Sequence, residues 1–213
     1  APYGRRETPF RVIGPTGTVA MMDHLQQAFA PVAQIRIEDE KILPESTRID
    51  ATEFGDEGVV WDRGGVVVTA FAVNHGDAIK PAFGYRVDYD GHSVVIGADT
   101  KYDENLIKHA QGTDLLIHEV AMARPEIADG PVQSRILGHH TLPAEAGEVF
   151  TKVAPKMAVY SHIVLLSTAE VPEPTADDLI AATRTTYDGP RVLGEDMMTF
   201  AIGDTVQPGT AGN

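Results

Sequence analysis

The sequence has no cysteine, few aromatic residues and no long apolar run. Without cysteine the chain forms no disulfide bond, and any metal ion must be held by histidine, aspartate or glutamate. The longest apolar run, residues 65–73, has the length of a strand and falls well short of the roughly 18 residues that a membrane-spanning helix needs. We therefore expect a soluble protein with no membrane association, and we leave its compartment, cytoplasm or periplasm, open.

Basic residues are also scarce. The 213 residues include 17 Lys and Arg against 31 Asp and Glu, which gives a formal net charge of −14. Nucleic-acid binding relies on cationic side chains that displace counterions from phosphates, so this composition argues against a nucleic-acid partner and favours a small-molecule substrate. The 43% apolar content suits one globular domain, which we expect over residues 1–203, with a flexible tail over 204–213. Assembly as a homodimer is left open.

Hairpin patterns dominate the first half of the chain, and strands alternate with helices in the second half. Asp90-Gly91 between two alternating segments predicts a hairpin. Helical spacing predicts helices over 18–30, 105–110, 143–153 and 177–187. The predicted strands are 10–13, 59–61, 66–73, 83–89, 93–97, 114–117, 157–160, 191–193 and 198–202, and residues 38–58 look irregular or hairpin-like. This order predicts an α/β protein with helices packed on mixed sheets.

Polar side chains follow four of the predicted strands, and a further histidine precedes a predicted helix. The residues after the strands are His75, Asp99, His118-Glu119 and His162, and the histidine before the helix is His140. Side chains at successive strand ends meet at one edge of a sheet, where active sites are common. Imidazole and carboxylate are ligands that suit zinc. The pattern therefore predicts a metal site at this edge.

Each of these residues has a simpler interpretation when taken alone. A histidine at a strand end is usually a hydrogen-bonding loop residue, Asp99 could cap a helix, and His118 could be structural. The remaining histidines, His24, His92 and His109, are assigned to the surface. The coincidence of four apolar strands that each deliver a histidine or a carboxylate favours the metal site.

Six segments, in order along the chain, resemble motifs of the ribonuclease Z/arylsulfatase branch of the metallo-β-lactamase-fold hydrolases. They are Gly14-Pro15-Thr16-Gly17, His75 with Phe83-Gly84-Tyr85-Arg86, Gly97-Ala98-Asp99-Thr100, Ile117-His118-Glu119, His140-Thr141 with Ala146-Gly147-Glu148, and Tyr160-Ser161-His162. The resemblance implies an αββα sandwich. It also implies that the fold is N-terminally incomplete here, since the His-x-His-x-Asp-His motif expected before Gly14 is absent.

The resemblance also assigns roles to five residues. His75, Asp99 and His162 would be metal ligands, with Asp99 bridging two zinc ions. His140 would be the catalytic acid and Glu119 its orienting partner. Two zinc ions are expected in the intact protein, and weak or absent zinc binding in this chain alone.

For the intact protein we expect a metal-dependent hydrolase of small phosphate, sulfate or carboxylic esters, with a small-molecule ester as its partner. Two alternatives are a non-catalytic fragment or degenerate binding domain of the same fold, and a tRNA 3′-processing endonuclease.

Overall fold

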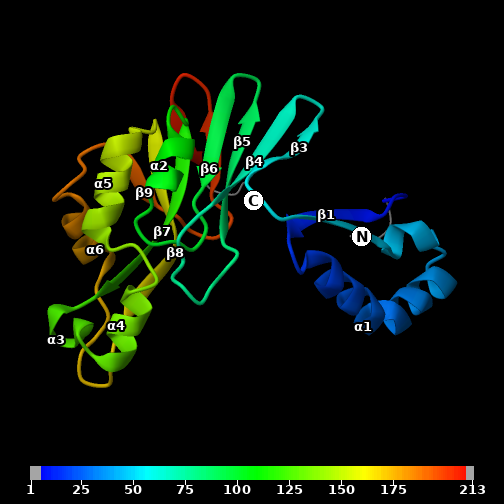
Figure 1. Cartoon of the computed structure of the whole chain (residues 1–213), viewed down its shortest axis with the longest axis horizontal. Coiled ribbons are helices and arrows are strands. Elements are labelled where there is room, and N and C mark those ends of the chain that lie inside the picture. Colours follow the sequence, from blue (N-terminus) through cyan, green and yellow to red (C-terminus); the bar gives the residue numbers. More distant parts are fainter. Residues whose placement is uncertain (1–5, 210–213) are drawn as a thin grey trace. The chain divides into compact units, whose positions relative to one another are not determined.

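The structure, a computed structural model, describes residues 6–209 and separates the chain into two compact units, Ala1–Asp56 and Glu57–Asn213. We call them the N-terminal unit and the C-terminal unit and describe each by itself (Figure 1). The single domain expected over residues 1–203 stays a prediction. Within residues 6–209, no helix is both long enough and apolar enough to cross a membrane.

The N-terminal unit is a strand–helix–strand motif. Strand β1 (Phe10–Pro15) and strand β2 (Ile49–Phe54) pair in parallel, and helix α1 (Thr18–Asp39) and the short 3-10 helix η1 (Pro44–Thr47) connect them. Residues 38–58, which were expected to be irregular or hairpin-like, therefore include a parallel strand, because the long connection through α1 allows a crossover that a tight turn does not. Helix α1 also continues through Pro31, well beyond the predicted end at residue 30.

A carboxylate from the neighbouring strand caps helix α1. Glu53 Oε1 accepts hydrogen bonds from the main-chain N–H of Gly17 at 2.9 Å and of Val19 at 2.8 Å. The hydroxyl of Thr18, the first residue of the helix, does not cap it, because Thr18 Oγ1 donates to the carbonyl of Pro15. The exposed N–H groups of the first helical turn are thus satisfied from a residue that lies more than 30 positions away in sequence.

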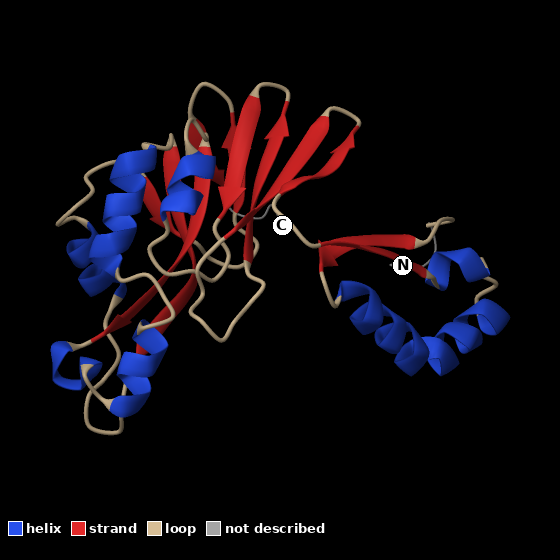
Figure 2. Ribbon diagram, in the orientation of Figure 1, coloured by secondary structure: helices blue, strands red, loops and turns tan. Residues whose placement is uncertain are grey.

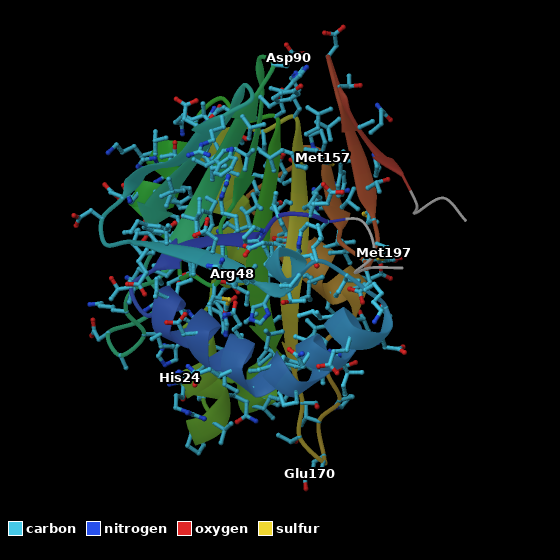
Figure 3. All side chains as sticks on the ribbon, turned by 90° about the vertical axis from the view of Figure 1, so that its right-hand side faces the viewer. His24, Arg48, Asp90, Met157, Glu170 and Met197 are labelled. Atoms are coloured by element: carbon cyan, nitrogen blue, oxygen red, sulfur yellow. The ribbon has the colours of Figure 1, made fainter. Side chains whose placement is uncertain are left out.

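The C-terminal unit is built on a seven-stranded sheet in the order β3-β4-β5-β6-β7-β8-β9. The strands are β3 (Gly58–Arg63), β4 (Val66–Ala72), β5 (Phe83–Tyr89), β6 (His92–Ile96), β7 (Leu115–Ala123), β8 (Met157–Leu166) and β9 (Arg191–Leu193). Pairing is antiparallel from β3 to β6 and parallel from β6 to β9. The predicted turn at Asp90-Gly91 is confirmed, with φ of 48° and 78° at the two residues. Figure 3 shows Asp90 and Glu170 at opposite ends of this unit.

Helices cover one face of this sheet (Figures 1 and 2). The helices of the unit are α2 (Glu104–Ala110), α3 (Pro125–Ala128), α4 (Pro131–Leu137), α5 (Pro143–Val153) and α6 (Ala176–Thr183). The core between α2, α5, α6 and the sheet includes Phe71, Leu106, Leu116, Phe150 and Leu179, all fully buried. Helix α5 buries the predicted apolar face, so its sequence periodicity is a reliable guide to its packing.

A short hairpin packs on the opposite face of the sheet. It consists of β10 (Thr199–Ile202) and β11 (Val206–Gly209), and buried Val206 contacts the cluster of Leu115 and Val159. Part of the tail predicted to be flexible over 204–213 is therefore an ordered strand, because it buries an apolar side chain against the sheet. Residues 210–213 of that tail lie outside the described residues.

Candidate metal and catalytic site

Hydrogen bonds to the main chain of Asn74 hold together the loops that follow β4 and β6. The carbonyl of Asn74 accepts from the N–H of Lys101 at 2.7 Å, and Asp103 Oδ2 accepts from the N–H of Asn74 at 2.9 Å. His75 lies in the first of these loops and Asp99 in the second. The two predicted ligands are thus positioned by a connection between neighbouring strand ends.

A β-bulge positions His162. In the pairing of β7 with β8, His118 lies opposite Tyr160 and Val120 opposite Ile163, so Ser161 and His162 together face Glu119 alone. His162 has a φ of 47°, in the left-handed region that residues with side chains seldom adopt. The sequence predicted that both strands end before their polar residues, but both continue past the bulge. Bulges often redirect a side chain next to an active site, and this one places His162 beside Asp99.

The three predicted metal ligands converge. His75 Nε2 lies 3.8 Å from Asp99 Oδ2, and His162 Nε2 lies 3.4 Å from Asp99 Oδ1. The carboxylate therefore stands between two imidazoles, with one oxygen toward each. His75 Nδ1 lies 2.9 Å from the carbonyl of His139, and because a carbonyl can only accept, Nδ1 is the donor in this contact.

His140 and Glu119 form a second, buried pair next to these ligands. His140 Nδ1 lies 3.1 Å from Glu119 Oε2, and the other carboxylate oxygen accepts the N–H of Thr141 at 2.6 Å. The Glu119 side chain is only 1% exposed. The ring centroid of His140 lies 5.5 Å from those of both His75 and His162. His140 therefore borders the metal-ligand group without being paired with Asp99.

Burial determines how the His140–Glu119 pair holds its proton. It raises the pKa of Glu119 to about 8, although the hydrogen bonds from Thr141 act in the opposite direction. Burial also lowers the pKa of His140, and the neighbouring His162 lowers it further. Both shifts disfavour an ion pair of a charged carboxylate with an imidazolium, and favour an uncharged pair in which one proton is shared between Glu119 Oε2 and His140 Nδ1.

The other histidines lie apart from this cluster. His118 is fully buried, with Nδ1 2.7 Å from the carbonyl of Glu119, in keeping with a structural role. His24 is exposed on α1, and half-exposed His92 pairs with Asp114 at 3.3 Å. His109 departs from its surface assignment, because its ring stacks on buried Phe71 with centroids 4.9 Å apart.

Three residues that contribute to the site were missed by sequence reasoning. Thr141 and Thr100 are fully buried, and Thr141 Oγ1 donates to the carbonyl of Thr100 at 2.8 Å, which joins the loop of His140 to that of Asp99. His139 contacts the loop of His75. All three are direct neighbours of Asp99 or His140 in the sequence, and this adjacency could have identified them as members of the site.

The chemistry of the donors fits zinc. Two imidazole nitrogens and a carboxylate are common zinc ligands, and a carbonyl on the second nitrogen of a ligating histidine is the usual outer support. Across residues 6–209, however, no group of three or more His, Asp or Glu side chains is arranged so that it could hold a metal ion by itself. The assignment of His75, Asp99 and His162 as zinc ligands therefore stays a prediction.

Solved structures with a similar arrangement of strands and helices identify the fold of this chain. The metallo-β-lactamase fold protein YhfI from Bacillus subtilis superposes with a TM-score of 0.63 and 17% identity, over 97% of this chain and 66% of that one. The short form of human tRNase Z superposes with a TM-score of 0.58 and 17% identity, over 90% of this chain and 67% of that one. The predicted α/β metallo-β-lactamase fold is therefore confirmed.

The chain belongs to the β-lactamase superfamily, a superfamily of hydrolases, because residues 4–163 match its "Beta-lactamase superfamily domain". Among curated relatives, ribonuclease Z of Mycobacterium marinum is 31% identical over 192 residues, which cover 89% of this chain and 66% of the relative. The chain thus spans just under two thirds of that relative's length.

Two expectations are corrected by these relatives. The predicted small-ester substrate and the predicted absence of a nucleic-acid partner are both contradicted by sequence relatives that carry the name ribonuclease Z. The error came from the net charge of −14. Net charge averages over the whole surface, whereas a polyanion binds to a local surface and to any cations held there.

Proposed function

We propose that the protein to which this chain belongs is a ribonuclease Z-type phosphodiesterase that processes the 3′ end of tRNA. The observation that carries the proposal is the Asp99 carboxylate between His75 Nε2 and His162 Nε2, with the His140–Glu119 pair beside it. The similarity to curated ribonuclease Z proteins supports the choice of a phosphodiester in RNA as substrate.

In this proposal His75, Asp99 and His162 would hold part of a dinuclear zinc site. Zinc takes about four ligands, so these three residues would not complete a zinc site by themselves. Bound zinc would supply a water molecule with a pKa lowered from about 15.7 toward 7, which is a nucleophile at neutral pH.

The His140–Glu119 pair would handle the proton. Attack at phosphorus breaks a P–O bond, and the leaving oxygen needs a proton as negative charge develops on it. His140 Nδ1 faces Glu119, so His140 Nε2 is the ring atom available to the substrate. When the shared proton moves from Glu119 Oε2 to His140 Nδ1, the ring becomes an imidazolium that can donate a proton from Nε2.

Asp99 provides the sharpest test. We would replace Asp99 with Asn in the whole protein and measure both zinc content and cleavage of a precursor tRNA with a 3′ trailer. Asp77→Asn is the matched control, since the Asp77 side chain lies in the same region and is fully exposed. We expect loss of zinc and of cleavage in Asp99→Asn only. Retention of both by Asp99→Asn, or a wild-type protein that leaves precursor tRNA intact, would contradict the proposal.

A further inference from the structure

His75 and His139 contact one another through two reciprocal interactions. His75 Nδ1 lies 2.9 Å from the carbonyl of His139, and His139 Nδ1 lies 3.3 Å from the carbonyl of His75. The two rings also meet edge to face, with centroids 5.9 Å apart. Each histidine therefore presents a ring nitrogen to the other's main chain, which constrains both the position and the tautomer of both rings.

The residue after His75 is a glycine, which leaves room for the ring of His139. Gly76 has a φ of 88°, which glycine adopts without strain. A Cβ atom at this position would lie 2.5 Å from His139 Nδ1 and 2.9 Å from its Cε1, closer than real Cβ contacts allow. Gly76 is thus required both by its backbone conformation and by the ring of His139.

Three consecutive residues of one loop attach to three different parts of the site. His139 contacts the loop of His75, His140 pairs with Glu119, and Thr141 Oγ1 donates to the carbonyl of Thr100 next to Asp99. Of these three consecutive residues, His139 is the one that forms hydrogen bonds with His75. Its ring is half-buried, in contrast to exposed His24 on α1.

We propose that His139 is a positioning residue that holds His75 in the tautomer and orientation that direct its Nε2 toward Asp99. The carbonyl of His139 accepts the proton of His75 Nδ1, and the ring of His139 anchors the main chain of His75. A histidine fixed in this way loses little freedom when it binds a metal, because its lone pair already points to the site. The inference rests on the proposed function in one respect, the assignment of His75 as a metal ligand.

The first experiment is ¹⁵N NMR of the histidine rings in the full 213-residue chain at pH 8 without metal. In the wild type, we expect the nitrogen shifts of His75 to report a single tautomer protonated at Nδ1. In His139→Ala, we expect shifts intermediate between the two tautomers. His139→Asn should restore the single tautomer, because its amide nitrogen is bonded to Cγ, as Nδ1 is in histidine. His24→Ala is the matched control and should leave His75 unchanged.

The second experiment measures the zinc affinity of the whole protein with the same variants. Loss of an outer support of a ligating histidine typically costs about 10–100-fold in metal affinity, and we expect this loss in His139→Ala and its recovery in His139→Asn. An unchanged His75 tautomer in His139→Ala would overturn the inference. A changed tautomer with unchanged zinc affinity would support the contact between the two histidines but contradict His75 as a ligand. Failure of the proposed function can therefore be told apart from failure of the positioning role of His139.

Discussion

The two units differ in how much apolar surface they bury. In the N-terminal unit, Met21, Phe29 and Ile35 of α1 are 55%, 62% and 62% exposed. In the C-terminal unit, Phe71 and Phe150 are fully buried between the sheet and its helices. Both units contain helices that connect parallel strands. The two-stranded sheet of the N-terminal unit is too small to cover the 22-residue helix α1, whereas the seven-stranded sheet covers the shorter helices α2, α5 and α6.

Apolar side chains stabilise a unit only where that unit buries them, so the apolar content of a helix does not by itself predict its contribution to stability. Helix α1 carries large apolar side chains, yet several of them have little to pack against within the N-terminal unit. The proposed site also lies within one unit, since residues 75 to 162 belong to the C-terminal unit. We therefore expect activity and most of the stability of the chain to depend on the C-terminal unit.

The largest expected effect is on catalysis. Replacing His140 with Ala in the whole protein should lower kcat for cleavage of precursor tRNA by about 10²–10⁴-fold, the usual contribution of a general acid. Zinc content should remain unchanged, because His140 is paired with Glu119 and not with Asp99. His24→Ala, in the N-terminal unit, is the control. Full turnover by His140→Ala would remove His140 from the mechanism.

The next effect concerns packing in the two units. Phe150→Ala should destabilise the C-terminal unit by about 3–5 kcal/mol, since it leaves a cavity in a fully buried position. Phe29→Ala should change the stability of the chain by no more than about 0.5 kcal/mol, because its side chain is 62% exposed. Urea unfolding of the full chain followed by circular dichroism measures both. Similar losses would mean that α1 is packed more tightly than the structure shows.

A smaller effect is expected from acid. Burial lowers the pKa of His118 to about 4 from the ordinary 6.5, so between these pH values the unfolded chain binds a proton that the folded chain does not. The contribution of His118 to the stability of the C-terminal unit should therefore fall by up to about 3 kcal/mol as the pH is lowered from 6.5 to 4.

Glu119 acts in the opposite sense. Its raised pKa of about 8 means that the folded state binds more protons than the unfolded state between about 4.5 and 8, which favours folding as the pH falls through that range. The difference between wild type and His118→Asn isolates the contribution of His118, because both proteins retain Glu119. Parallel stability curves for the two proteins from pH 6.5 to 4 would contradict the prediction.

The smallest expected effect is at the cap of α1. Glu53→Ala should cost about 0.5–2 kcal/mol in helix stability, because two N–H groups at the start of the helix lose their acceptor. Hydrogen exchange at the amide of Val19 should become faster, while exchange in α5 should not change. Asp23→Ala, an exposed residue in the same helix, is the control. Unchanged exchange at Val19 would show that the carboxylate of Glu53 is not the cap.

Local patterns predicted most of the C-terminal unit. The hairpin at Asp90-Gly91 and the buried face of α5 followed from residue type and spacing, since turn chemistry and helix periodicity act over a few residues. The lengths of β7 and β8 did not follow. Both strands continue beyond Glu119 and His162 because they pair with one another, and such pairing joins segments about 40 residues apart.

Residue types and motif order were enough to name the candidate site residues: with no cysteine, a metal could bind only His, Asp and Glu, and the order of the motifs pointed to His75, Asp99, His140 and His162. How these side chains meet could not be predicted in the same way. A bulge opposite Glu119 turns His162 toward Asp99, and His139 contacts His75 across 64 residues. Side-chain identity is local information, whereas direction and distance arise from the pairing of strands that are far apart in sequence.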